Sequence, residues 1–256
     1  MKFSIITPSY NRPELLIRAV KSILEQTYED FELIIINDSP SYDYSLVLDF
    51  IDKNIQNKKI KYIVNKNNKG VNYSRNVGLQ NISEDSDYFI FLDDDDWLDK
   101  NVLQKAKEEI EKIENKNNSW FVSNHFDINK NSKATKNKTG KNTINYLSDY
   151  LILKKFTGDA KHVISVKYGD LRFSNKVKNG EEWFYFAQIK TDFVYYDYNS
   201  SYSDGYLAGG LTNNLKNKKQ KLINTYLLFW ECTEIHNMSP KIFLYFILRI
   251  VAIILK

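Results

Sequence analysis

Several residue types that define common protein classes are scarce in this sequence. It has one cysteine, three histidines, nine glycines and four prolines among 256 residues. The single cysteine, Cys232, excludes a disulfide framework and a cysteine-based zinc site, and three histidines leave little for a histidine-rich metal site. So few glycines and prolines exclude a collagen-like chain, and no internal repeat is visible in the sequence.

The net charge is also small, because 36 lysines and arginines face 32 aspartates and glutamates, which leaves +4. Such a small and mixed charge does not predict a nucleic-acid-binding protein. The chain is 43% hydrophobic and 27% charged, which is ordinary for a globular protein and excludes both wholesale disorder and a polytopic membrane protein. A length of 256 residues suits one large domain or one domain with a small appendage.

Short apolar runs alternate with helical spacing in the first half of the chain. The start carries one charge and a short apolar run ended by Pro8, so we expect a buried strand there rather than a signal peptide. Further strands are expected at 31–36, 60–64 and 88–92, and helices at 13–27, around 46–51, at 71–79 and at 99–114. With right-handed crossovers, this order predicts an α/β protein with a doubly wound parallel sheet.

The second half of the chain is less regular. Strands are expected at 119–128, 162–166 and 193–198, and helices at 144–155, at 181–189 and over most of the chain from 215. A tract of lysine, asparagine, serine and threonine at 129–142 predicts a mobile surface loop.

Polar residues follow three of the expected parallel strands, at 7–11, 37–38 and 93–96. Doubly wound sheets bind their ligands at the carboxyl ends of the strands. The three polar segments should therefore converge in one cleft, although they are far apart in the sequence.

The last of these segments consists of four adjacent aspartates, Asp93, Asp94, Asp95 and Asp96. Their mutual repulsion after a buried strand costs stability unless a cation neutralises them. Oxygen ligands without cysteine or histidine nearby favour Mg²⁺ or Mn²⁺, and so short a loop cannot build a calcium cage. We therefore expect an open metal site shared with a diphosphate; the alternative is a solvated acidic turn that caps the following helix.

Two more segments carry charged residues that could act together with these aspartates. Arg75 opens a helix beside the sheet edge, where it could face phosphates or the acidic cluster, or form a plain ion pair with Asp38 or Asp93. Glu181 and Glu182 start an amphipathic helix. The helix dipole explains one carboxylate at such a place, but the pair could also supply a general base near a reacting hydroxyl.

Together these segments resemble the family 2 glycosyltransferases, which have the GT-A fold. The resemblance extends from residue 2 to 189 and, more weakly, to 213. The residues that carry it are 6–12, 37–38, 68–79, 91–97 and 180–183. It implies an inverting glycosyltransferase that moves a hexose or N-acetylhexosamine from a UDP-sugar to a hydroxyl of a glycan acceptor.

The resemblance also implies roles for individual residues. Asp38 would hydrogen-bond the edge of the base, usually uracil in this family, and Arg75 would contact the nucleotide or its diphosphate. Asp95 would hold the Mn²⁺ or Mg²⁺ that bridges the phosphates, and Asp93 would reach the ribose and the sugar beside the metal. The other expected contacts to the nucleotide-sugar come from Thr7, Pro8, Tyr10, Arg12 and Asp94.

The sequence departs from the family pattern at two places. Glu182 stands where the family has its catalytic aspartate and is one methylene longer, so Glu182 or Glu181 is the expected base. Many members carry a histidine after the last sheet strand, close to the metal or diphosphate, but residues 202–206 contain none. Asp204 is the expected substitute at the metal, or this loop closes over the donor.

The apolar stretch after Pro240 is about fifteen residues long and contains Arg249, whereas a helix that spans a bilayer needs about twenty. It could pack on the globular domain, form a dimer contact, or lie in the bilayer interface as a monotopic helix. A basic patch precedes it and would favour anionic lipid; it consists of Lys216, Lys218, Lys219 and Lys221.

These features predict a glycosyltransferase domain at 1–213 and a helical, membrane-associating segment at 214–256. The domain would contain a nucleotide-binding half at 1–115 and an acceptor half at 116–213. The resemblance and the C-terminal segment imply a lipid-linked oligosaccharide, lipooligosaccharide or capsule acceptor and a peripheral position on the inner face of the cytoplasmic membrane. The small net charge implies no nucleic-acid partner.

Two other functions compete with this one. A sugar nucleotidyltransferase shares the sheet topology and the acidic metal site, but it needs a glycine-rich loop after the first strand, and residues 7–12 contain no glycine. A catalytically degenerate GT-A domain could serve as a binding or scaffold protein. The complete aspartate cluster and the glutamate pair argue against that alternative.

Overall fold

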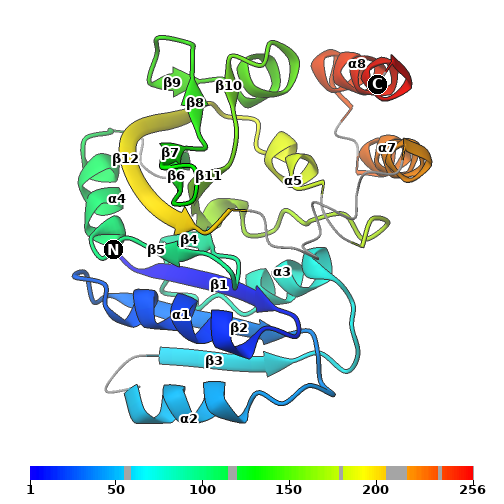
Figure 1. Cartoon of the computed structure of the whole chain (residues 1–256). Coiled ribbons are helices and arrows are strands. Elements are labelled where there is room, and N and C mark those ends of the chain that lie inside the picture. The colour runs from blue at the N-terminus through cyan, green and yellow to red at the C-terminus, as the bar shows by residue number, and fades with distance from the viewer. Residues whose placement is uncertain (55–58, 115–119, 179–180, 206–217, 236–237, 256) are drawn as a thin grey trace.

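The computed structural model describes residues 1–54, 59–114, 120–178, 181–205, 218–235 and 238–255. These residues form one large mixed sheet with helices packed on both of its faces (Figure 1). Across the sheet the strands follow in the order β3 (Lys59–Val64), β2 (Phe31–Asn37), β1 (Phe3–Ser9), β4 (Tyr88–Phe91), β11 (Ala160–Ser165), β6 (Trp120–Asp127), β12 (Phe193–Ser203) and β5 (Trp97–Leu98).

The first half of the chain builds the parallel part of this sheet. β3, β2, β1 and β4 run parallel to one another. Every residue of β1 and β2 is buried, because helices cover both faces of a parallel sheet. The doubly wound α/β architecture that the alternation of apolar runs predicts is thus confirmed.

The second half of the chain adds antiparallel neighbours. β11 is antiparallel to both β4 and β6, whereas β6 and β12 run parallel. The sheet is therefore mixed rather than wholly parallel. β12 ends at Ser203, five residues beyond the expected end at 198, and this extension continues the pairing to Asp127, the last residue of β6.

The segment 129–142, expected to be a surface loop, forms short strands instead. β7 (Ser132–Lys133) pairs with β6, and β8 (Lys136–Asn137) pairs with β10 (Phe156–Thr157). The Ala134 amide donates to the His125 carbonyl at 2.8 Å, and the His125 amide donates to Thr135 Oγ1 at 3.0 Å. The polar composition hid these strands, because two-residue strands carry no hydrophobic periodicity.

The helices divide between the two faces because alternate strand residues point to opposite sides of the sheet. Ile5 belongs to a hydrophobic cluster that also contains residues of α1 (Pro13–Leu24), α2 (Ser45–Asn54) and α4 (Val102–Glu111). Ile6 belongs to a second cluster, which includes residues of α3 (Val71–Gln80), α5 (Trp183–Gln188), α7 (Lys218–Glu234) and α8 (Pro240–Leu255). The helix expected at 144–155 is present as a π-helix, Tyr146–Ile152.

Helix α3 approaches the sheet unusually closely. A Cβ atom added to Gly78 would lie 2.2 Å from Ile6 Cγ2, so only glycine permits this distance. The close approach seats the first turns of α3, and with them Arg75, at the carboxyl end of β1.

The C-terminal helix α8 packs on the domain by one face. Ile242, Tyr245 and Phe246 are buried there, and the rings of Tyr245 and Phe246 lie 4.7 Å and 5.5 Å from that of Trp183 at their centroids. The other face leaves large apolar side chains in solvent, among them Val251 and Ile254. Figure 1 shows α7 and α8 side by side next to α5, at the end of the molecule opposite α2.

Candidate active site

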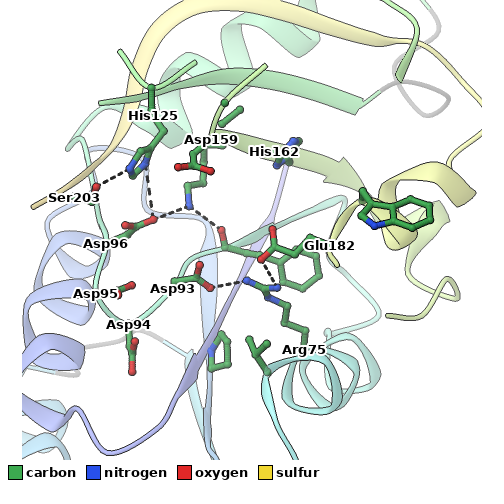
Figure 2. A pocket seen from close by; sticks show the side chains of 18 of the residues that line it. Arg75, Asp93, Asp94, Asp95, Asp96, His125, Asp159, His162, Glu182 and Ser203 are labelled. Carbon is green, nitrogen blue, oxygen red and sulfur yellow. Dashed lines mark hydrogen bonds and ion pairs between the residues drawn. The ribbon is translucent and has the colours of Figure 1, made fainter. Parts of the chain in front are cut away.

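The carboxyl ends of β1, β2 and β4 open into a pocket of about 860 Å³. Residues after each of these strands line it, including Tyr10 after β1, Asp38 after β2 and the aspartates after β4. The convergence that the sequence predicts for these segments is therefore confirmed. Figure 2 shows Arg75 and Glu182 reaching the same space from two further elements.

Asp38 holds the chain segment that leads into α3. Its Oδ1 accepts hydrogen bonds from the Lys69 amide and Asn65 Nδ2, both at 2.8 Å, and its Oδ2 accepts one from the Gly70 amide at 2.7 Å. A carboxylate offers about four acceptor positions, so one of them remains for a base edge. The contact of Asp38 with uracil stays a prediction, with room for one hydrogen bond.

Arg75 lies at the centre of the site and is buried. Its Nη2 donates to Asp93 Oδ1 and its Nη1 to Glu182 Oε1, both at 2.7 Å (Figure 2). Burial alone would lower the pKa of the guanidinium, but the carboxylates of Glu182 and Asp93 outweigh it and raise that pKa. Of the partners that the sequence leaves open, Arg75 thus takes Asp93, and it adds Glu182.

The other aspartates after β4 also have polar partners. Ser9 Oγ donates to Asp94 Oδ2 at 2.8 Å, and Arg12 Nη1 donates to Asp95 Oδ2 at 2.8 Å. Asp96 Oδ2 lies 3.6 Å from the amine of Lys161, which β11 supplies. The cluster is therefore part of the pocket wall rather than a solvated turn.

Burial and mutual repulsion raise the pKa of three of these four carboxyl groups, because the nearby cations do not offset them. Burial, followed by the Asp95 carboxylate, raises the pKa of Asp94 to about 7. Burial and Asp93 raise the pKa of Asp95, and burial raises that of Asp96 against the pull of Lys161. Asp93 differs from the other three aspartates, because burial is outweighed there by nearby cations, which lower its pKa. Arg75 has the larger effect and Lys161 the smaller one.

These carboxylates fit a divalent cation that is shared with a diphosphate. Additional positive charge would stabilise the ionised forms of Asp94, Asp95 and Asp96, and all the donors are hard oxygens. Within the described ranges, no group of three or more His, Cys, Asp or Glu side chains is arranged to hold a metal by itself. An ion bound by Asp95 and Asp93 would thus need phosphate oxygens and water as further ligands, which is the usual mode of Mg²⁺.

The two glutamates of the expected base pair point in different directions. Glu182 is 49% exposed and lines the pocket, where Arg75 holds it. Glu181 is 9% exposed and turns away from the pocket; its Oε2 accepts from Trp183 Nε1 at 2.6 Å, and both oxygens accept from Arg249. Glu182 therefore has the geometry of a candidate base, and Glu181 has that of a structural anchor.

Two other expected ligands lie apart from the pocket lining. Thr7 is fully buried within β1. Asp204 forms an ion pair with Arg18 of α1 at 2.5 Å, and Arg18 Nη2 also donates to the Asp95 carbonyl at 2.6 Å. Asp204 is thus linked to the loop of residues 93–96 through Arg18, while its predicted role as a metal ligand stays a prediction.

Two residues that sequence reasoning missed complete the acidic end of the pocket. Lys161 Nζ donates to the Phe91 carbonyl at 3.2 Å, beside Asp96. His125 on β6 lies between Ser201 and Ser203, and burial, then Lys161, lowers its pKa to about 4, so the ring is neutral at pH 7. No sequence signal marks either residue, because each lies in a strand with several polar residues and belongs to no motif.

Other residues that line the pocket suit a carbohydrate. Four aromatic side chains contribute apolar surface to its wall, and lysines contribute donors. They are Tyr146, Tyr150, Trp183 and Phe186, with Lys130, Lys133, Lys136 and Lys178.

Comparisons with known proteins agree with this chemistry. A family model described as glycosyl transferase family 2 matches residues 4–167. The chain is 31% identical to the minor teichoic acid biosynthesis protein GgaA of Bacillus subtilis. The similarity extends over 192 residues, 73% of this chain and 43% of that protein. The chain is 40% identical to the GalNAc(5)-diNAcBac-PP-undecaprenol beta-1,3-glucosyltransferase of Campylobacter jejuni. That similarity extends over 112 residues, 42% of this chain and 35% of that protein.

The chain thus spans less than half the length of either relative. Among solved structures, S. aureus TarS 1–349 in complex with UDP-GlcNAc superimposes with a TM-score of 0.70 at 19% identity, over 89% of this chain and 65% of that one. Likeness at this identity concerns the fold, and it confirms the expected GT-A arrangement.

Proposed function

Because the chain belongs to glycosyl transferase family 2, we propose that it transfers a hexose or N-acetylhexosamine from a UDP-sugar to a hydroxyl of a glycan acceptor, with inversion. One observation carries the proposal. Arg75 joins the candidate base Glu182 to the first aspartate of the acidic cluster, Asp93, inside one pocket. A base, a fixed cation and a set of metal-binding oxygens are the groups that such a displacement requires.

Glu182 acts as the general base in this mechanism. Its carboxylate takes the proton of the acceptor hydroxyl while the oxygen bonds to the anomeric carbon from the face opposite the diphosphate. The bond from that carbon to the diphosphate oxygen breaks, and UDP leaves. Arg75 holds Glu182 by a charge-assisted hydrogen bond of 2.7 Å, which fixes the direction of the carboxylate.

Charge on the leaving UDP must be neutralised as it develops. Asp95 and Asp93 would hold Mn²⁺ or Mg²⁺ there, and the ion would supply Lewis-acid stabilisation of the diphosphate. Asp38, Pro8, Tyr10 and Arg12 line the proposed nucleotide side of the pocket. A UDP donor is supported by the TarS complex with UDP-GlcNAc, whose fold this chain shares.

The proposed activity is tested by UDP release. The wild-type protein is incubated with UDP-glucose, UDP-galactose and their N-acetyl forms, each with Mn²⁺, Mg²⁺ or EDTA. We expect UDP from at least one donor, and only with the metal. UDP binding without turnover would favour the scaffold alternative, and neither binding nor turnover with any UDP-sugar would contradict the proposal.

The acceptor is proposed to be lipid-linked, which the resemblance to an undecaprenol-linked glucosyltransferase supports. The C-terminal helices offer a surface for such an acceptor. Tyr226 and Trp230 of α7 and Val251 and Ile254 of α8 are exposed apolar side chains, between 46% and 63% accessible. Lys218, Lys219 and Lys221 begin α7 or lie in its first turn, whereas Lys216 is outside the described residues.

Among the described residues, no helix is both long enough and apolar enough to cross a bilayer. We propose that α7 and α8 instead rest on an anionic membrane surface, at the inner face of the cytoplasmic membrane. The mode is interfacial, because one face of α8 is already used by Tyr245 and Phe246 to pack on the domain.

Substitution on the open face of α8 tests this membrane contact. Val251→Asp with Ile254→Asp is expected to lower binding to phosphatidylglycerol-containing vesicles at least about tenfold, since each buried aliphatic side chain contributes about 1.5–3 kcal/mol. Cosedimentation measures the effect. Point substitutions are preferable to deletion of α8, because Ile242 and Phe246 belong to the core.

The matched control is Leu46→Asp, an equally drastic change at a 60% exposed position of α2. It should bind vesicles as the wild-type protein does. If the α8 variant also sediments unchanged, α8 does not rest on the membrane.

A further inference from the structure

An arginine stands in the apolar part of α8 without an obvious reason in the sequence. Arg249 is one of only two charged residues in this helix, and its side chain is 20% exposed. A charge in such surroundings is costly unless it is paired. The structure shows the pairing, because Arg249 Nη2 lies 2.5 Å from both carboxylate oxygens of Glu181.

Arg249 ties three elements together. Its Nε donates to Thr225 Oγ1 of α7 at 3.1 Å, and its Nη1 donates to the Tyr245 hydroxyl at 3.2 Å. Its guanidinium carbon lies 5.6 Å from the centre of the Trp183 ring. Trp183 Nε1 in turn donates to Glu181 Oε2, so the glutamate is held from two sides.

The backbone of Glu181 needs such a restraint. Its φ angle is +61°, in the left-handed region that is unfavourable for a residue with a Cβ. A residue stays in this conformation only where its surroundings determine it. The contacts from Arg249 and Trp183 are the side-chain contacts that hold the Glu181 carboxylate.

The strained residue directly precedes the proposed base. Glu182 returns to a helical φ of −57° as the cap of α5 and reaches into the pocket toward Arg75. The turn from Glu181 to Glu182 therefore sends one carboxylate to α8 and the next one to the active site. Release of Glu181 would allow the turn to relax and Glu182 to move.

We propose that Arg249 is a positioning residue for the catalytic base, and that α8 is thereby part of the active site. This inference rests on the proposed function. Arg249 holds Glu181 in its left-handed conformation, and this conformation presents Glu182 to the acceptor hydroxyl. The surface helix that faces the membrane thus sets the geometry of the base.

Neither Arg249 nor Glu181 lines the pocket, so loss of the clamp should affect the reaction step and spare the donor site. For Arg249→Gln we expect kcat to fall about 10²-fold, the effect of a misplacement of about 1 Å. The KM for the UDP-sugar should stay within about twofold, because that site is untouched. Arg249→Lys keeps the charge but loses the planar fork, and we expect an intermediate kcat.

Glu181→Gln should reproduce the loss, since the clamp is a unit. In the double variant of Arg249→Gln and Glu181→Gln, kcat should be no lower than in the worse single variant. The control is Lys241→Gln, which removes a positive charge from an exposed position of the same helix and should leave kcat unchanged.

A second measurement does not depend on activity. Amide hydrogen exchange over residues 181–188 should be faster in Arg249→Gln than in the wild-type protein, in the absence of any substrate, while exchange in β1 and β2 stays the same. Exchange in the core strands also shows that the variant is folded. If the wild-type protein released no UDP, the proposed function would fail, and the exchange experiment would still decide whether the clamp exists.

Any one of several results would overturn the positioning role. They are unchanged exchange over 181–188, a rise in donor KM with unchanged kcat, or multiplicative losses in the double variant. Faster exchange together with an unchanged kcat would likewise reject it, because the clamp would then be structural only.

Discussion

Glu182→Gln is expected to abolish sugar transfer while donor binding stays intact. The amide is isosteric with the carboxylate and can still accept the hydrogen bond from Arg75, but it cannot take a proton from the acceptor hydroxyl. Loss of a general base costs about 10²–10⁴-fold in rate. Transfer to a glycan acceptor and calorimetric titration of the UDP-sugar, performed on the same preparation, measure the two effects separately.

Glu182→Asp is the matched variant, because the resemblance to family 2 glycosyltransferases places an aspartate here. It should retain more activity than Glu182→Gln, although the carboxylate is one methylene shorter. Turnover like that of the wild-type protein in Glu182→Gln would assign the base to another residue, and Glu181 would then have to leave Arg249 to reach the pocket.

Asp95→Asn is expected to remove metal-dependent donor binding. Asp95 is the residue proposed to hold the ion, and its Oδ2 already accepts from Arg12 at 2.8 Å. Metal coordination of a diphosphate contributes several kcal/mol, so the affinity for UDP-sugar in Mn²⁺ should fall by about 10²-fold or more. Titration with Mn²⁺ and with EDTA measures this, and in EDTA the variant should match the wild-type protein.

Asp95 is a cleaner target than Asp93 for this experiment. Replacement of Asp93 would also take one of two carboxylates from the buried Arg75, which destabilises the protein for a reason unrelated to metal. Asp204→Asn tests the predicted third ligand. This variant should lose metal-dependent donor binding only if Asp204 leaves Arg18 to bind the metal in the wild-type protein. If Asp95→Asn bound the UDP-sugar in Mn²⁺ as tightly as the wild-type protein does, and lost that affinity in EDTA to the same extent, the proposed metal site would be wrong.

The pocket also bears on the alternative functions. The Glu182 carboxylate is 49% exposed and is held by the buried Arg75. This arrangement is expected of a general base and is not required in a scaffold protein. A sugar nucleotidyltransferase would hold a triphosphate with a glycine-rich loop after β1, and the residues there are Tyr10, Asn11 and Arg12. The UDP-release experiment separates these alternatives from a glycosyltransferase.

Local patterns in the sequence determined the framework of this protein. The buried runs of β1, β2 and β4 and the helical spacing of α1 and α3 are legible because strand and helix have different hydrophobic periods. Crossover handedness then restricts the order of the strands. The carboxyl ends of β1, β2 and β4 had to meet, and so the sequence alone could place Asp38 and the aspartate cluster in one cleft.

The tertiary structure decided what depends on distant or isolated residues. Lys161 and His125 reach Asp96 only because β11 and β6 pair in the antiparallel half of the sheet, and two-residue strands in 129–142 complete that side. Both strands carry several polar residues, and no periodic signal singles out one of them. The sequence therefore identified the acidic loop but could not find its partners, the cationic Lys161 and the neutral His125.

The roles of Glu181 and Glu182 show the same division most clearly. As neighbours at a helix start they are equivalent in the sequence. One left-handed backbone angle at Glu181 and one arginine 68 residues away in α8 send them in different directions. A dihedral angle of this kind is set by packing and not by local propensity, so only the folded chain distinguishes the candidate base from its anchor.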